Sequence, residues 1–249
     1  MRSIIRALRL RPRGLTRSAA VLIASLTGSG LLGTPPAHSE QVVLSVSQQQ
    51  VLITSSFSGA DLVVFGVAEQ GATKDPSADV VVSARGPKQT FLTWRKSRVL
   101  GLWMNTDSRP FLDVPGYLSV QSNRPIGLMA KPELLRSEQL GLQRTLLVQR
   151  VGTDYADVVP SDPFRAAFLR IQEAHDLYQE DPNGVTFIAP NVFRAGLRIP
   201  GHAPLGRYDV TVALLRDGQV TGHAQTSFEV TRTGIEQEIA DLARNQSLL

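Results

Sequence analysis

Cysteine is absent from the 249-residue sequence, so the chain can form neither disulfide bonds nor thiolate metal sites. Histidine is scarce, and the three that follow residue 39 are His175, His202 and His223. None has the His-x-x-x-His or Glu-x-x-His spacing that places two metal ligands on one helix face. No Gly-x-Ser-x-Gly nucleophile motif and no Gly-x-x-x-x-Gly-Lys phosphate loop follows residue 39. We therefore expect no catalytic residue, no metal site and no cofactor.

The basic residues are unevenly distributed along the chain. The formal net charge is +4, but residues 1–39 hold six of the 26 Lys and Arg and none of the 22 Asp and Glu. Removing those six leaves 20 basic against 22 acidic side chains, so residues 40–249 carry −2. A near-neutral body lacks the basic surface that nucleic-acid binding requires, and we expect no nucleic-acid partner.

Residues 1–39 have the pattern of a secretory signal peptide. Arginines up to Arg17 precede an apolar segment at residues 19–33, and the small residues Ala37 and Ser39 stand where cleavage usually occurs. The apolar segment is shorter than the ~20 residues that span a bilayer. We expect cleavage before Glu40 and a periplasmic body, with an uncleaved membrane anchor as the alternative.

Residues 40–131 are predicted to form a first β-sandwich domain. Short runs rich in β-branched residues alternate with breaks containing Gly, Pro or polar residues, which is typical of antiparallel sandwiches. Outside residues 91–105, the predicted strands are residues 42–46, 50–54, 62–67, 79–85, 117–121 and 126–130.

Both tryptophans of the chain lie in residues 91–105, which we predict to anchor the fold. Residues 99–104 are almost all apolar, which favours a central strand covered on both faces. The charged run Arg95–Arg98 cannot be buried unpaired. We therefore place it at the exposed tip of a hairpin with arms at residues 91–94 and 99–105. No Asn-Gly or Asp-Gly pair marks the turn, so a single bulged strand is the alternative.

Residues 132–183 are predicted to be a helical connector, with a short helix at residues 132–142 and a longer amphipathic one. Ser161-Asp162-Pro163 is a good helix start, with Ser161 or Asp162 as the cap, and an Asp-Pro-Asn-Gly stop begins at residue 181. The apolar face carries Phe164, Phe168, Ile171 and Tyr178. The side that we expect to be exposed carries Arg165, Arg170, Glu173, Asp176 and Glu180.

Residues 184–233 are predicted to form a second β-sandwich region, and Asp217-Gly218 supplies a hairpin turn. Its predicted strands are residues 185–189, 192–199, 206–215, 220–223 and 225–231. Residues 234–249 carry an apolar stripe at helical spacing, and we expect a C-terminal juxtamembrane-like helix. The predicted fold is mainly β: two immunoglobulin-like antiparallel β-sandwich regions, with an amphipathic helix between them and a C-terminal helix.

A cluster of basic residues is the strongest candidate binding site in the sequence. Two adjacent hairpins would bring them to one edge, where they could dock an anionic ligand, a headgroup or an acidic partner. A solvated loop rim is the alternative. The residues are Arg85, Lys88, Arg95, Lys96 and Arg98.

A series of short motifs runs through nearly all of residues 40–249. They are Phe57-Ser-Gly-Ala-Asp-Leu-Val-Val-Phe-Gly66, Arg85-Gly-Pro87, the stretch from Arg95 to Asn105, Val114-Pro-Gly-Tyr117, Phe164-Arg165-Ala-Ala, Leu177-Tyr178, Phe193-Arg194-Ala195, Pro204-Leu-Gly206-Arg-Tyr208 and Thr233-Gly234-Ile-Glu236-Gln. In this order the motifs resemble the alphaproteobacterial putative transmembrane family, exported proteins of uncharacterised function.

The resemblance implies a periplasmic β-rich region followed by one C-terminal membrane-spanning helix that anchors the protein to the inner membrane. We expect that span to begin directly after Leu249, so that the sequence stops before it; a soluble member is the alternative. The resemblance also implies an inner-membrane permease of the sulfite-exporter type as partner, because such genes are found nearby. It supplies no catalytic residue.

Export, the sandwich pattern and the missing catalytic motifs together predict a non-enzymatic periplasmic accessory or binding protein. We expect it to be membrane-associated and to work with a transporter or envelope complex. The alternative is an exported small-ligand carrier or enzyme with a pocket between the two β regions, near Tyr178 and residues 200–204. A two-sandwich chaperone that accepts partner strands at a sheet edge is a third hypothesis.

Overall fold

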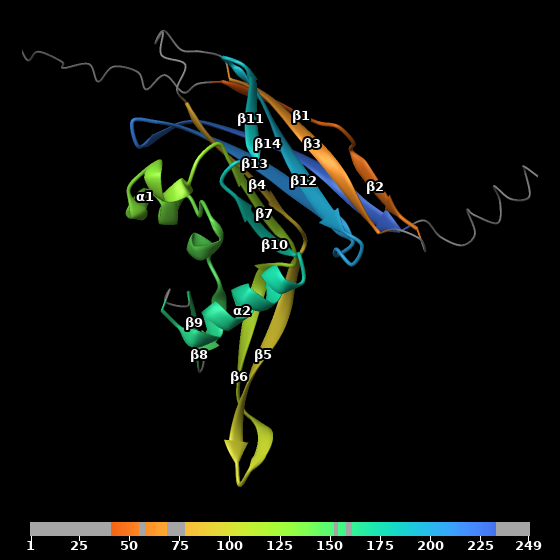
Figure 1. The fold of residues 1–249 in the computed structure, drawn as a ribbon, viewed down its shortest axis with the longest axis vertical. Coiled ribbons are helices and arrows are strands. Elements are labelled where there is room, and N and C mark those ends of the chain that lie inside the picture. The colour runs from red at the N-terminus through yellow and green to blue at the C-terminus, as the bar shows by residue number, and fades with distance from the viewer. Residues whose placement is uncertain (1–40, 55–57, 69–77, 152–153, 158–160, 233–249) are drawn as a thin grey trace, which may run out of the picture. The chain divides into compact units, whose positions relative to one another are not determined.

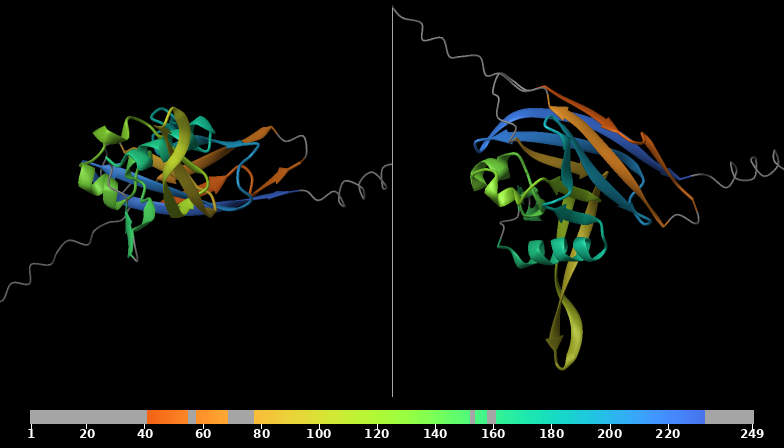
Figure 2. Two further views of the ribbon diagram at one scale, coloured as in Figure 1. Left: turned by 90° about the horizontal axis from the view of Figure 1, so that it is seen from below. Right: turned by 45° about the horizontal axis from the view of Figure 1, so that its top comes forward.

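The computed structural model describes residues 41–54, 58–68, 78–151, 154–157 and 161–232. The predicted signal peptide and C-terminal helix lie outside these residues. The described chain is mainly β, as predicted, and its strands form three sheets (Figures 1 and 2). Among the described residues, no helix is long and apolar enough to cross a membrane.

The first two sheets hold most of the buried core. The four-stranded sheet has the order β1 (Val42–Val46), β3 (Gly59–Ala68), β12 (Val192–Pro200), β11 (Val185–Ala189). The six-stranded sheet has the order β10 (Tyr178–Asp181), β7 (Leu118–Ser122), β4 (Asp79–Arg85), β13 (Gly206–Arg216), β14 (Gln219–Arg232), β2 (Gln50–Ile53).

The third sheet is built on a long hairpin. Its order is β5 (Lys88–Val99), β6 (Leu102–Pro115), β8 (Val148–Val151), β9 (Asp154–Asp157). The helical elements are η1 (Ile126–Leu128), α1 (Pro132–Ser137), η2 (Leu142–Arg144) and α2 (Pro163–Ala174).

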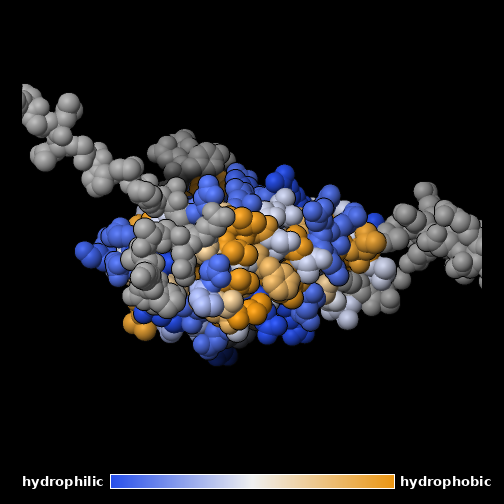
Figure 3. Space-filling model, turned by 90° about the horizontal axis from the view of Figure 1, so that it is seen from above, coloured by the Kyte–Doolittle hydropathy of each residue, from blue (hydrophilic) through white to orange (hydrophobic). Residues whose placement is uncertain are grey.

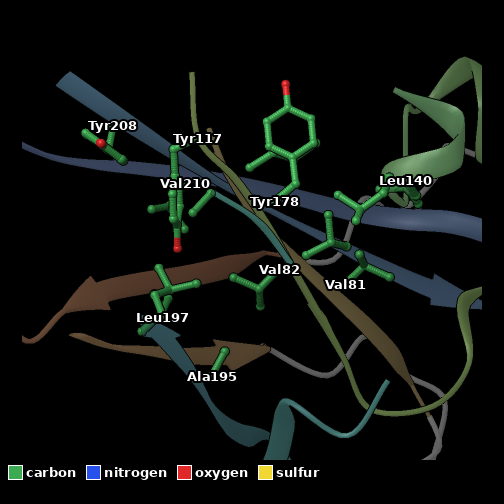
Figure 4. Close-up of a cluster of buried hydrophobic side chains, with 14 of the residues drawn as sticks. Val81, Val82, Tyr117, Leu140, Tyr178, Ala195, Leu197, Tyr208 and Val210 are labelled. Atoms are coloured by element: carbon green, nitrogen blue, oxygen red, sulfur yellow. The ribbon is translucent and has the colours of Figure 1, made fainter. Parts of the chain in front are cut away.

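Side-chain pattern explains where each strand lies. β4 has an unbroken apolar run and is buried on both faces in the middle of its sheet. In β13, Tyr208, Val210 and Val212 are buried, whereas the residues between them are partly exposed. Figure 4 shows side chains from both sheets in one cluster, with Ala195 and Leu197 of β12 near Val82 of β4. Burying each large apolar side chain contributes about 1.5–3 kcal/mol.

Two features of the strand order differ from the predicted fold. Both core sheets contain strands from residues 40–131 and strands from residues 184–233, so the two predicted sandwich regions are not separate. The sheets are also not purely antiparallel, because β10 pairs with β7 and β14 with β2 in parallel. Both differences arise from pairings between residues far apart in the sequence, which local patterns do not encode.

Several predicted elements have other bounds or another type in the structure. Residues 126–130, predicted as a strand, begin with the 3-10 turn η1. The two strands predicted at residues 220–223 and 225–231 are one long strand, β14. The turn at Asp217-Gly218 is confirmed, with positive φ at both residues and β13 paired to β14 around it.

Helix α2 begins as predicted but ends early. The carboxylate of Asp162 accepts hydrogen bonds from the backbone amides of Phe164 and Arg165, which caps the helix N-terminus. The helix ends at Ala174, so Tyr178 belongs to strand β10 and not to the helical face. Arg165 was expected on the exposed side, and its side chain is buried.

A close approach between strands makes Gly66 sensitive to substitution. Gly66 of β3 pairs with Phe193 of β12, and a Cβ at Gly66 would lie 2.1 Å from Cζ of Phe193. We expect Gly66→Ala to lower the free energy of unfolding by about 1–3 kcal/mol, measured by urea denaturation. Gly196→Ala in β12 is the control, because nothing lies within 4 Å of its Cβ position. Equal losses in both variants would contradict this packing argument.

Candidate functional site: the β5–β6 hairpin

The hairpin of β5 and β6 is confirmed as an element, but its turn lies elsewhere than predicted. The turn is Leu100-Gly101, and the charged run Arg95–Arg98 belongs to strand β5. A bulge at Thr106 shifts the register between Arg95 and Lys96. We call residues 96–105, the part of the hairpin beyond this bulge, the hairpin tip. In Figures 1 and 2 the hairpin runs on past α2, and its tip extends away from the other described elements.

The hairpin tip exposes large apolar side chains, which overturns the prediction that residues 99–104 form a buried central strand. Leu100 is 100% exposed, Leu102 69% and Trp103 71%. Val99 and Met104 are exposed as well. The apolar run was taken as a sign of burial, but no other described element packs on it. Contiguous exposed apolar side chains of this kind mark interaction sites.

The turn itself is not optimised for stability. Leu100 has φ +51° and Gly101 has φ +87°, the combination for which two-residue hairpin turns prefer Asn-Gly. A bulky L-residue in the left-handed region costs roughly 1–2 kcal/mol. Leu100 therefore adopts an unfavourable backbone conformation and also exposes its whole side chain to water. Neither folding nor solubility explains a leucine at this position.

Basic residues flank the apolar tip. Lys96 and Arg98 form no ion pair with any acidic residue in the described ranges, and the Arg98 Nε donates to the Gly101 carbonyl at 3.2 Å. Arg98 and Trp103 are register partners, so they share one face of the hairpin. Arg95, on the other side of the bulge, pairs with Asp107 at 3.4 Å. The tip thus combines apolar side chains with two cations that have no acidic partner among the residues that the structure describes.

The base of the hairpin is held by an aromatic cluster on α2. The Phe168 ring lies 5.4 Å from Phe91 of β5, 4.8 Å from Phe111 of β6 and 5.8 Å from Tyr178, measured between centroids. The Tyr178 hydroxyl donates to the Pro115 carbonyl at 2.6 Å. Aromatic pairs at these separations stabilise a packing arrangement beyond their buried area.

Polar contacts add to this base. The Arg109 guanidinium of β6 donates to Gln149 at 3.0 Å, pairs with the α2 cap Asp162 at 3.4 Å, and lies 5.0 Å from the Phe164 ring centroid. Arg95 also lies over the Phe164 ring, at 5.7 Å. The start of α2 therefore contacts both hairpin strands. The base of the hairpin is fixed by these contacts, whereas its tip is exposed.

The five basic residues predicted as one patch fall into separate places. Lys88 and Arg98 stand near opposite ends of β5, ten residues and therefore about 33 Å apart along the strand. Arg85 and Lys88 line an open cleft of about 770 Å³ together with Arg207. Arg85 donates to the Gln139 carbonyl at 3.2 Å, and burial lowers its pKa. Lys96 and Arg98 belong to the hairpin tip, whereas Arg95 faces α2.

In the region near Tyr178 and residues 200–204, where the sequence suggested a pocket, the structure shows the following contacts. Tyr178 is buried, and burial raises its pKa. His202 makes a 2.7 Å hydrogen bond with the His175 carbonyl, and the two imidazole rings lie 6.5 Å apart. His223 lies apart from them, 3.5 Å from Glu138. Within the described ranges, no three His, Cys, Asp or Glu side chains group as metal ligands.

A second apolar surface lies on the outer face of the four-stranded sheet. Val43 of β1, Phe65 of β3 and Ile188 of β11 are exposed there. Figure 3, seen from the top of Figure 1, shows apolar residues near the middle of the face with hydrophilic residues around them. Phe65 is the register partner of Arg194, so charge interrupts this surface.

Analysis of the sequence proposed the five basic residues as the binding site and did not recognise the exposed apolar residues of the hairpin tip as part of it. Gly101 within an apolar run, with cations on one side, was the available signal that the run turns back on itself.

Comparison with protein families agrees with the resemblance seen in the sequence. No curated protein matches the chain. The family profile described as "Putative transmembrane protein (Alph_Pro_TM)" matches residues 41–249, almost the whole chain, which therefore belongs to this alphaproteobacterial family of putative transmembrane proteins.

Proposed function

We propose that the chain is a non-enzymatic accessory protein of the periplasm that is membrane-associated and acts by contact through the hairpin tip. The observation that carries the proposal is the exposed apolar tip on a base held by α2. A protein whose contact element is fixed at its base loses less conformational entropy on binding than one whose element must first become ordered. Membership of a family named for a membrane span supports a position at the membrane.

We propose further that the body carrying the hairpin is a single immunoglobulin-like sandwich, and that the partner belongs to the inner membrane. A permease of the sulfite-exporter type fits this position.

The absence of cysteine from the chain makes labelling experiments simple, because any introduced cysteine is a unique labelling site.

A shortened hairpin tests the proposed function. Replacing residues 97–104 by Asn-Gly joins the register partners Lys96 and Asn105 through a favoured two-residue turn. Both chains carry a fluorophore on Leu128→Cys, an exposed site in η1 outside the hairpin. We expect the parent chain to bind to spheroplasts, which expose the periplasmic face of the inner membrane. The shortened chain should bind at least tenfold more weakly, because it lacks the apolar contact.

The free energy of unfolding of the shortened chain should lie within about 0.5 kcal/mol of that of the parent, since the removed side chains lie away from the core. This comparison separates lost contact from lost folding. Equal binding of two folded chains would contradict the proposed function.

A further inference from the structure

We propose that the hairpin tip is a lipid-binding wedge, which inserts into the headgroup region of a bilayer that contains anionic phospholipid. This inference rests on the proposed function and names the partner surface of the same site. It follows from three properties of the tip: its length, its placement of charge and its narrow shape.

The length of the tip matches the depth of the interface. Leu100 at the apex and Lys96 are four residues apart, or about 13 Å along a β-strand. Interfacial elements bury their apolar face about 5–10 Å into the boundary between headgroups and acyl chains. Insertion by about 5 Å would immerse Leu100 and Leu102, while Arg98, two residues from the apex, and Lys96, four residues from it, stay at the headgroups.

The charges stand where the headgroups would lie. From Arg95 to Thr106 the sequence has three basic residues and no acidic one. Long basic side chains extend from a buried stem to the headgroups, and they are attracted by anionic lipid. Trp103 shares a face with Arg98, and tryptophan is enriched at the depth of the headgroups.

The shape of the tip favours a lipid surface over a protein one. The tip is two strands wide, so it offers only a small contact area. A stable protein interface buries about 800 Å² on each partner. The outer face of the four-stranded sheet is the rival apolar surface, but it is the face of a sheet and carries Arg194 next to Phe65. A narrow apolar apex, followed along the strand by two cations that no described acidic residue pairs with, is complementary to an anionic bilayer.

The two tryptophans allow a direct test, because they are the only two of the chain and both lie on β5 or β6. Trp94→Phe leaves Trp103 at the tip as the fluorophore, and Trp103→Phe leaves Trp94, about 20 Å along β5 from the apex. On adding phosphatidylethanolamine–phosphatidylglycerol vesicles, we expect Trp103 emission to shift to the blue and to become shielded from acrylamide. Trp94 emission should not change.

Matched variants attribute binding to the tip. Leu100→Asn suits the turn and removes the apolar apex, so it should fold normally and weaken vesicle binding about tenfold. Lys96→Gln and Arg98→Gln should each weaken it about fivefold. Val43→Ser, on the rival apolar surface, should leave binding unchanged. All variants carry the same terminal segments, so differences between them report on the substituted residue.

Three outcomes would overturn the lipid proposal. The first is no change in Trp103 emission with anionic vesicles, and the second is an equal response to phosphatidylcholine vesicles. The third is loss of spheroplast binding after protease treatment of the spheroplasts, without any vesicle binding. In that third case the tip docks on a membrane protein, and the proposed function stands while this inference fails.

Discussion

Replacing Arg165 by methionine is expected to lower the free energy of unfolding by about 2–5 kcal/mol. The Arg165 side chain is 2% exposed, and its Nη2 donates to the carbonyls of Gln143 at 3.0 Å and of Thr145 at 2.7 Å. Its Nη1 lies 3.8 Å from Asp157. Burial lowers the pKa of Arg165 and the nearby Asp157 raises it, but an arginine in a protein stays protonated at neutral pH.

The loss is large because methionine fills similar space without donating a hydrogen bond. The carbonyls of Gln143 and Thr145 would then lose a buried partner, at roughly 1–3 kcal/mol for each group left unsatisfied. Asp157 would keep Arg136, at 2.6 Å, and the Leu147 amide, at 3.0 Å. The destabilisation should therefore come from the connection between α2 and residues 143–145.

Urea denaturation of Arg165→Met and of Arg170→Met measures this effect. Arg170 is exposed on the same helix, so its replacement should change stability by less than about 0.5 kcal/mol. Similar stabilities for the two variants would show that the buried guanidinium does not hold α2. Because Phe164 and Phe168 next to it hold the hairpin base, the Arg165 variant should also bind spheroplasts more weakly.

Local sequence patterns predicted the elements whose burial is set by their own residues. The buried strand β4, with its valine run, and the short strand β11 have the bounds expected from sequence, and Asp217-Gly218 forms the expected turn. In each case the signal is a property of consecutive residues. The pairing of β1 with β3 and of β3 with β12 depends on residues far apart, and no local pattern contains it.

The candidate site was predicted in part, for a related reason. An apolar run such as residues 99–104 indicates burial only when another element covers it, and sequence pattern does not say whether one does. Lys96 and Arg98 were recognised as exposed cations, but Arg85 and Lys88 were placed with them because closeness in sequence suggested closeness in space. Arg165 was expected in solvent because carbonyl partners from the preceding loop leave no mark in the periodicity of a helix.

A photoreactive group on the hairpin tip is expected to crosslink to the membrane far more than one on an equally exposed control site. Leu102 and Leu128 are almost equally exposed, at 69% and 70%, but only Leu102 is in the tip. Leu102→Cys and Leu128→Cys can each carry one benzophenone, because the chain has no other cysteine. A group buried in a contact reacts with its neighbour, whereas a group in water is mostly quenched by solvent.

This crosslinking, performed on spheroplasts with the two labelled chains, tests most directly whether the hairpin tip is the contact surface. We expect adducts to membrane lipid or protein from Leu102→Cys at least tenfold above those from Leu128→Cys, in line with burial of one large apolar side chain. Equal yields from both positions, or adducts only from Leu128→Cys, would show that the molecule meets its partner through another surface.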